Sequence, residues 1–186
     1  MHDECGDVPF GKPCRAGLTI GVEGRAVTTT LLTDDAAHVL TRFVDGETID
    51  RDTMMAVFAG DDPFAGQYLG LTFTSFHREK LVATLNADER MHQPFGIVHG
   101  GVWCSVIESV ASIAGWLHVA MDGYVVVGVN NTTDFLRPHV TGPVIITGTP
   151  LHIGRQQHLW QVDICTTEKK RVAHGQVRLH VMRPPS

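Results

Sequence analysis

A single carboxylate inside an apolar stretch is the residue of this sequence best suited to chemistry. Glu108 is the only charged residue in the run Val102–Met121, where the other residues are apolar, small or neutral polar. A buried, unpaired carboxylate is so unfavourable that it gains a partner or keeps its proton. Two hypotheses follow: a structural glutamate that hydrogen-bonds a loop or a partner subunit, or a carboxylate held in a cleft as a general base or nucleophile.

Three serines accompany this carboxylate at regular spacing. Ser105 precedes Glu108 by three residues, and Ser109 and Ser112 follow it by one and four. Residues three or four apart lie on the same face of a helix. The run therefore predicts an apolar helix with one narrow polar stripe, and the stripe is where we expect any reaction to take place.

The loop before this run offers hydrogen-bond donors. His99, Gly100 and Gly101 open the predicted helix, whose first N–H groups have no partner within the helix and lie at the positive end of its dipole. Glycines there allow another group to approach the backbone closely. Such a site suits a developing oxyanion, although a Gly-Gly pair at a helix start is by itself more often a turn.

The elements that must position these residues form an α+β pattern. The run Val102–Met121 makes a helix of about 30 Å, ended at Gly123. Strand-like runs flank it, two before and four after, at 69–76, 80–86, 125–129, 144–149, 159–165 and 173–182. No second crossover helix separates the later strands, so a parallel sheet is a poor alternative. We expect an antiparallel sheet wrapped around one long central helix.

The front of the chain differs in charge. Residues 1–62 hold 12 acidic and 5 basic side chains, whereas residues 63–186 hold 8 acidic and 10 basic ones. Weak strands are expected within residues 18–32, and Asp50 or Asp52 is expected to cap a short helix over Thr53–Ala59, ended by Gly60. The sequence indicates an acidic N-terminal extension over residues 1–48 and a main domain over residues 49–186.

Composition excludes several classes of protein. The net charge of −5 argues against nucleic-acid binding. The four cysteines lack paired spacing, and the start lacks a signal-peptide pattern, so we expect free thiols and a cytoplasmic protein. A membrane helix would tolerate Glu108 poorly. The eleven histidines form no zinc motif, and no nucleotide-binding fingerprint is present, so neither a metal nor a tightly bound cofactor is expected.

Several segments resemble a known family. Residues 93–101 (QPFGIVHGG) and 107–115 (IESVASIAG) are similar to the active-site segment of hotdog-fold thioesterases of the 4-hydroxybenzoyl-CoA thioesterase type. The similarity is greatest to the branch that contains 1,4-dihydroxy-2-naphthoyl-CoA hydrolase and the enterobactin proofreading thioesterase. Residues 126–128 and 150–156 resemble the same branch, and the similarity runs from about residue 49 to 182. The spacing of Gln93 and His99 before Glu108 matches the family.

The resemblance implies the hotdog fold and hydrolysis of an acyl-CoA or acyl-carrier-protein thioester. By this resemblance, Glu108 attacks the carbonyl carbon or activates a water, which Ser112 holds. The Gly100 N–H and the Gln93 side chain polarise the thioester oxygen, and His99 orients that oxygen or the leaving thiolate.

The resemblance also implies partners. Coenzyme A is part of the substrate, no further cofactor is required, and an aryl-CoA of menaquinone biosynthesis, 1,4-dihydroxy-2-naphthoyl-CoA, is the favoured substrate. The expected substrate or CoA contacts are Gly101, Gly128, Arg137, Gly154 and Arg155. The site is expected between two subunits of a homodimer, with homotetramers formed from pairs of dimers. Trp103 and Cys104 replace small residues of the branch, so the acyl group itself is not specified.

Two alternatives stay open on the sequence. One is a hotdog enoyl-thioester hydratase, whose catalytic histidine and acid lie in a different motif. The other is a non-catalytic acyl-CoA binding or sensing protein, which would not need Gln93, Glu108 and Ser112 together. The presence of all three favours the thioesterase.

Overall fold

The chain forms two compact units, residues 1–31 with 185–186 and residues 32–184. The structure, a computed structural model, describes residues 19–22, 25–28, 33–55, 57–58 and 63–184. In the first unit, β1 (Thr19–Val22) and β2 (Arg25–Thr28) pair as an antiparallel hairpin. These two strands account for the weak strand pattern expected within residues 18–32.

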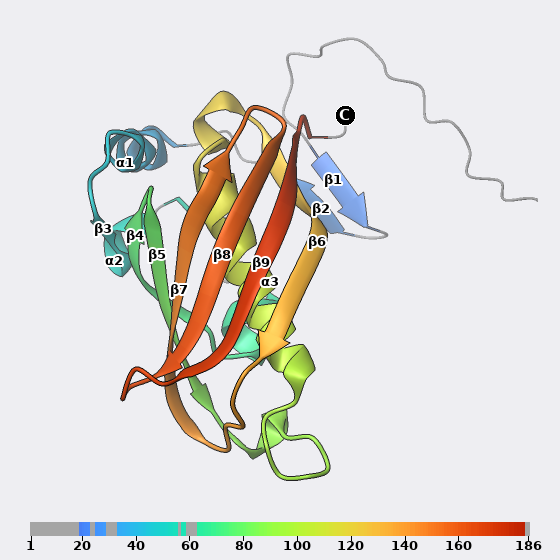
Figure 1. Ribbon diagram of the computed structural model, residues 1–186. Coiled ribbons are helices and arrows are strands. Elements are labelled where there is room, and N and C mark those ends of the chain that lie inside the picture. The colour runs from blue at the N-terminus through green and yellow to red at the C-terminus, as the bar shows by residue number, and fades with distance from the viewer. Residues whose placement is uncertain (1–18, 23–24, 29–32, 56, 59–62, 185–186) are drawn as a thin grey trace, which may run out of the picture. The chain divides into compact units, whose positions relative to one another are not determined.

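The second unit contains one antiparallel sheet and a long helix (Figure 1). Its strands lie in the order β3-β4-β5-β7-β8-β9-β6, so β6 ends the sheet on one side. The elements of this unit are α1 (Asp34–Val44), β3 (Ile49–Asp50), α2 (Arg51–Met54), η1 (Pro63–Tyr68), β4 (Thr72–His77), β5 (Lys80–Ala87), η2 (Glu89–Met91), α3 (Gly100–Leu117), η3 (Ala120–Asp122), β6 (Val125–Phe135), β7 (Gly142–Ile153), β8 (Gln157–Thr166) and β9 (Arg171–Met182). The predicted α+β arrangement is confirmed.

The central helix α3 is enclosed by the sheet. It is long and apolar enough to cross a membrane, but Val106, Ile107, Val110 and Leu117 are fully buried in the core. The helix begins two residues before the predicted start, because the His99 side chain caps it. It ends at Leu117, and the predicted remainder forms the separate turn η3, closed at Gly123.

Helix α1 lies within the predicted extension. Thr33 caps it, and its apolar side chains are buried in the same core as those of α3. The compact unit therefore begins near residue 32, whereas the sequence places a boundary at residue 48. That boundary stays a prediction about domain organisation. Helix α2 begins with the expected Asp50 cap but already ends at Met54, and the proposed stop Gly60 lies outside the described residues.

Strand β6 is longer than predicted and irregular. It was expected to end at Val129 but continues to Phe135. Its second half contains Asn130, Asn131 and Asp134, and asparagine and aspartate are uncommon in strands, so the strand signal there is weak. Its register against β9 shifts between Gly128 and Asn130, which marks a β-bulge. This bulge determines which side chains of β6 face α3.

Candidate active site

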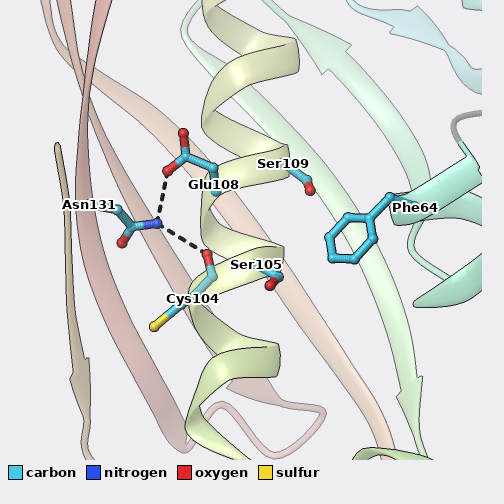
Figure 2. A pocket seen from close by; sticks show the side chains of 6 residues that line it. All are labelled: Phe64, Cys104, Ser105, Glu108, Ser109 and Asn131. Carbon is cyan, nitrogen blue, oxygen red and sulfur yellow. Dashed lines mark hydrogen bonds between the residues drawn. The ribbon is translucent and has the colours of Figure 1, made fainter. Parts of the chain in front are cut away.

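A pocket of about 340 Å³ opens beside the middle of α3. Figure 2 shows its six lining residues: Phe64, Cys104, Ser105, Glu108, Ser109 and Asn131. Four of them come from α3, because residues spaced by three and four share one helix face. Phe64 comes from η1 and Asn131 from β6. Three of the four residues of the predicted polar stripe, Ser105, Glu108 and Ser109, therefore line this pocket.

The carboxylate of Glu108 lies against β6. The Asn131 Nδ2 atom donates to Glu108 Oε2 at 2.9 Å and to the Cys104 carbonyl at 3.1 Å. The other oxygen, Oε1, lies over Gly128, where a Cβ atom would be only 2.1 Å away. Gly128, expected to contact the substrate or CoA, here makes room for the carboxylate itself.

The serines of the stripe are not equivalent. The Ser105 hydroxyl donates to the Gly101 carbonyl at 2.9 Å, within the helix. Ser109 lines the pocket opposite Phe64 (Figure 2). Ser112 is half-buried one turn beyond Glu108 and is not among the pocket-lining residues. Its role in holding a water stays a prediction.

His99 is the N-cap of α3. Its Nδ1 atom accepts a hydrogen bond from the Gly101 N–H at 2.9 Å. In a neutral ring the proton is then on Nε2, which makes that atom a donor. Backbone hydrogen bonds from His99 to Met91 and from Val98 to His139 hold this end of the loop in place. An exposed imidazole donor is thus fixed at the start of the helix.

Gly100 is the first residue of α3 and has an aromatic neighbour. A Cβ atom at Gly100 would lie 2.7 Å from the Phe135 ring, so any larger residue would displace that ring. Gln93 lies in the loop before the helix, where its backbone N–H donates to the Ile97 carbonyl at 2.8 Å and Gly96 takes a φ of +74°. The Gln93 side chain is half-buried.

Within one chain the predicted catalytic residues fall into two groups. Gly100 and Glu108 are separated by eight residues of continuous helix, about 12 Å along its axis. Gln93, His99 and Gly100 gather at the start of α3, whereas Glu108 lies at its middle. The two groups are too far apart to act together on one carbonyl of a small thioester.

The predicted CoA contacts lie elsewhere on the surface. Gly154 and Arg155 form the turn between β7 and β8, and Arg155 is exposed. The Gly154 N–H donates to the Gln157 carbonyl at 2.9 Å. Arg137 donates to the Arg171 carbonyl at 2.7 Å. Gly101 contacts the His99 ring at the helix start. Among the described residues, no group of three His, Cys, Asp or Glu side chains could hold a metal ion.

Sequence reasoning missed Phe64 and the hydrogen bond from Asn131 to Glu108. Phe64 lies in η1, a short π-helix that has no α-helical periodicity, and its ring stacks on that of Tyr68 with the centroids 5.9 Å apart. Asn131 follows the β-bulge, and strict alternation along the strand would have placed its side chain on the opposite face. A polar residue beyond the bulge becomes significant only when its contact with Glu108 is seen.

A second polar group lies against the C-terminal end of α3. His158 is buried, with 1% of its surface exposed, and burial together with the nearby His118 and His152 lowers its pKa to about 4. Burial also lowers the pKa of His118. Within the described part of the chain, neither His158 Nδ1 nor Trp160 Nε1 has a hydrogen-bond partner. These residues pack by ring contacts, with His118 and Trp160 centroids 5.3 Å apart.

Comparison with known proteins places these features in a family context. Residues 95–173 match the model of the Thioesterase superfamily. The protein MT1895 of Mycobacterium tuberculosis is 47% identical over 119 residues, covering 63% of this chain and 84% of that protein. Its solved structure, at 43% identity, has a TM-score of 0.64 and covers 67% of this chain and 100% of that one.

Two further relatives carry thioesterase in their names. The proofreading thioesterase EntH of Klebsiella pneumoniae is 34% identical over 119 residues, covering 64% of this chain and 86% of that protein. The solved structure of thioesterase HI1161 from Haemophilus influenzae has a TM-score of 0.65 at 31% identity and covers 76% of this chain and 96% of that one.

Proposed function

This chain belongs to the thioesterase superfamily and is a thioester hydrolase, and we propose that it hydrolyses the CoA thioester of an aromatic acid with Glu108 as its reacting carboxylate. The observation that carries the proposal is the pocket that Glu108 lines together with Phe64, where Asn131 holds its carboxylate by a hydrogen bond. A carboxylate that is held yet accessible can attack a carbonyl carbon or take a proton from water.

The donors at the start of α3 complete the proposed chemistry. The Gly100 N–H and the Gln93 amide would donate to the thioester oxygen as it gains negative charge. The Nε2–H of His99 is directed by the cap geometry and would donate to the oxygen or the leaving thiolate. Attack of the Glu108 carboxylate on the carbonyl carbon would break the C–S bond and release the coenzyme A thiolate, which takes up a proton. The mixed anhydride left on Glu108 would then be hydrolysed by water, which gives the acid and restores the carboxylate. Alternatively, Glu108 would activate a water bound by Ser112. Either path yields the acid and free coenzyme A.

We propose that each site combines residues of two subunits. The separation of about 12 Å along α3 between Gly100 and Glu108 prevents one chain from supplying both groups to a single carbonyl. The terminal strand β6 exposes Val127, Val129 and Phe135, which is consistent with a covered face in a homodimer. Dimers would pair into a homotetramer, as the family resemblance suggests.

An aromatic acyl group fits the wall of the pocket. The Phe64 ring faces Ser105 and Ser109 across the pocket and is stacked on Tyr68 at an interplanar angle of 10°. Stacking against such a ring adds to simple burial. We therefore take 1,4-dihydroxy-2-naphthoyl-CoA, benzoyl-CoA and phenylacetyl-CoA as the first substrates to test. The exposed Arg155, with Arg137 as a weaker candidate, would contact the phosphates of coenzyme A.

A thiol-release assay tests the reaction and its carboxylate. We expect the wild type to hydrolyse aryl-CoAs, and Glu108→Gln to reduce kcat/KM by about 10²–10⁴-fold, because the variant keeps the shape but loses the base. Glu79→Gln, on the exposed β4–β5 turn, is the control and should retain full activity. Full activity in Glu108→Gln would remove this residue from the mechanism.

Phe64→Leu tests the acyl preference. We expect kcat/KM for aryl-CoAs to fall by about 3- to 10-fold while that for decanoyl-CoA changes less, because only the aromatic contact is lost. An equal decrease for both substrates would contradict an aromatic pocket.

Subunit mixing tests the shared site. Glu108→Gln and Gln93→Ala subunits, each impaired when alone, are coexpressed with different tags and the hybrid dimers are purified. One site of each hybrid would contain neither substitution, so we expect activity well above that of either parent. Hybrids no more active than their parents would place the complete site within one chain.

A further inference from the structure

The Asn131 side chain makes three hydrogen bonds, one of them to Glu108. Its two amide hydrogens reach Glu108 Oε2 at 2.9 Å and the Cys104 carbonyl at 3.1 Å, as Figure 2 shows. Its Oδ1 accepts from the Thr133 hydroxyl at 2.8 Å. The reverse orientation of the amide would set its oxygen against two acceptors, so these partners determine the orientation.

The β-bulge of β6 directs Asn131 toward α3. Gly128 is paired with Leu179 and Asn131 with Val177, so three steps on β6 match two on β9. The extra residue lets Gly128 and Asn131 both face the helix, because a bulge re-aims the side chains that follow it. The same irregularity thus provides the space for Oε1 and the donor for Oε2.

We infer that Asn131 is a positioning residue of the thioesterase reaction, a role that rests on the proposed role of Glu108. Its amide donates a hydrogen bond to Oε2 and so limits rotation of the carboxylate. Oε1, which accepts no hydrogen bond from the described residues, is then left for the carbonyl carbon or the water. Thr133 acts one step further away, because its hydroxyl keeps the amide nitrogen directed at the carboxylate.

This arrangement predicts an effect on kcat rather than on substrate binding. Removing a hydrogen bond to a charged group weakens both the orientation and the ionised form of the carboxylate. The other titratable side chain lining the pocket is Cys104, and the lining residues from η1 and β6 are Phe64 and Asn131 themselves. A change in the acid limb of the pH–rate profile would therefore report on Glu108.

The test compares Asn131→Ala, Asn131→Asp and Thr133→Val in the full-length enzyme. We expect Asn131→Ala to lower kcat by about 10- to 100-fold with KM nearly unchanged, and its rate to fall at a higher pH on acidification than that of the wild type. Asn131→Asp should be worse, because it sets a second carboxylate against Glu108. Thr133→Val, which leaves both residues in place, should show a smaller decrease in the same direction.

Asn130→Ala is the matched control. Asn130 is adjacent and pairs with Arg178 on the outer face of the sheet, so its removal should change neither kcat nor the pH profile. Wild-type kcat in Asn131→Ala would overturn the proposal. Equal losses in Asn131→Ala and Asn131→Asp with an unshifted acid limb would also overturn it, because that pattern indicates a merely structural role. Glu108→Gln separates the two ideas, since its full activity would refute the proposed function itself.

Discussion

Polar side chains have opposite environments at the middle and at the C-terminal end of α3. Glu108 and Gly115 are seven residues apart on the helix, about 10 Å along its axis, and both face the sheet. At Glu108 the carboxylate is hydrogen-bonded and open to a pocket. Around Gly115, His158 Nδ1 and Trp160 Nε1 are buried and lack partners among the described residues. We therefore take a polar group near this helix as a candidate for reaction only where it has both a hydrogen-bond partner and access to a pocket.

The largest effect is expected on stability, when the pH is lowered and the buried His158 at the C-terminal end of α3 takes up a proton. His158 binds a proton near pH 6.5 in the unfolded chain but only near pH 4 in the folded protein. The free energy of unfolding should thus be unaffected above the unfolded pKa and should fall by roughly 3 kcal/mol as the pH is lowered from 6.5 to 4. His118, whose pKa is also lowered, adds in the same direction.

Urea unfolding near neutral pH and at about pH 4.5 measures this dependence. His158→Leu should remove most of it, because the group that titrates differently in the two states is gone. His180→Gln, an exposed position on β9, serves as the control and should keep the wild-type dependence. The same dependence in His158→Leu and wild type would show that His158 is not the group responsible.

A methyl group added opposite Glu108 should affect activity rather than stability. In Gly128→Ala the new Cβ would lie 2.1 Å from Oε1, so the carboxylate must move. A shift of this size costs about 10²-fold in kcat/KM, because the reacting groups lose their alignment. Steady-state kinetics on the folded variant measures it. Wild-type kcat/KM in Gly128→Ala would show that the observed carboxylate position is not the reactive one.

The same methyl group at the other end should affect stability instead. In Gly115→Ala the Cβ would lie 2.4 Å from Leu179 Cδ1, deep in the core. Overpacking of this kind lowers the free energy of unfolding by about 1–3 kcal/mol, while kcat/KM per folded molecule should stay near wild type. Denaturant unfolding and kinetics measured together on Gly115→Ala and Gly128→Ala would separate the two regions. A large loss of kcat/KM in Gly115→Ala would contradict the assignment of stability to the C-terminal end of α3 and of activity to its middle.

The smallest effect is expected within the pocket itself. The Ser105 hydroxyl lines the pocket, but its proton is donated to the Gly101 carbonyl. Ser105→Ala should change stability by no more than about 0.5 kcal/mol, and kcat/KM should stay near wild type. Thermal unfolding and the thiol-release assay check both. A decrease as large as that of Gly128→Ala would assign Ser105 a direct role.

Helix α3 and the antiparallel sheet could be predicted because their signals are local. The run around Glu108 is apolar on nearly all sides, whereas a surface helix needs only one apolar face. In β8 and β9, apolar and polar residues alternate regularly. Helix α1 was missed although its signal is present. Ala36, Val39, Leu40 and Phe43 repeat at spacings of three, one and three behind the cap Thr33. The surrounding segment is acidic and rich in glycine, a composition typical of loops, and it masks this short amphipathic pattern.

The part of the site that could not be predicted depends on non-local geometry. A strand with strict alternation has its side chains on opposite faces at each step, so Gly128 and Asn131 would face opposite sides. Only the register shift against β9 brings them to the same side. The separation of Gly100 from Glu108, in contrast, follows directly from helix length. Once the helix is predicted, this distance follows from the rise of about 1.5 Å per residue.

The cap of α3 joins a structural role and a proposed catalytic role in one side chain. The His99 ring both starts the helix and, through its Nδ1 contact with Gly101, sets the proton on its other nitrogen. Serine, aspartate and asparagine are the usual residues for such a cap. Replacing His99 by one of these residues would keep the helix cap but remove the imidazole. Because His99 is a proposed donor to the thioester, such a variant is expected to fold normally but react slowly, and thus to hold its thioester substrate long enough for trapping.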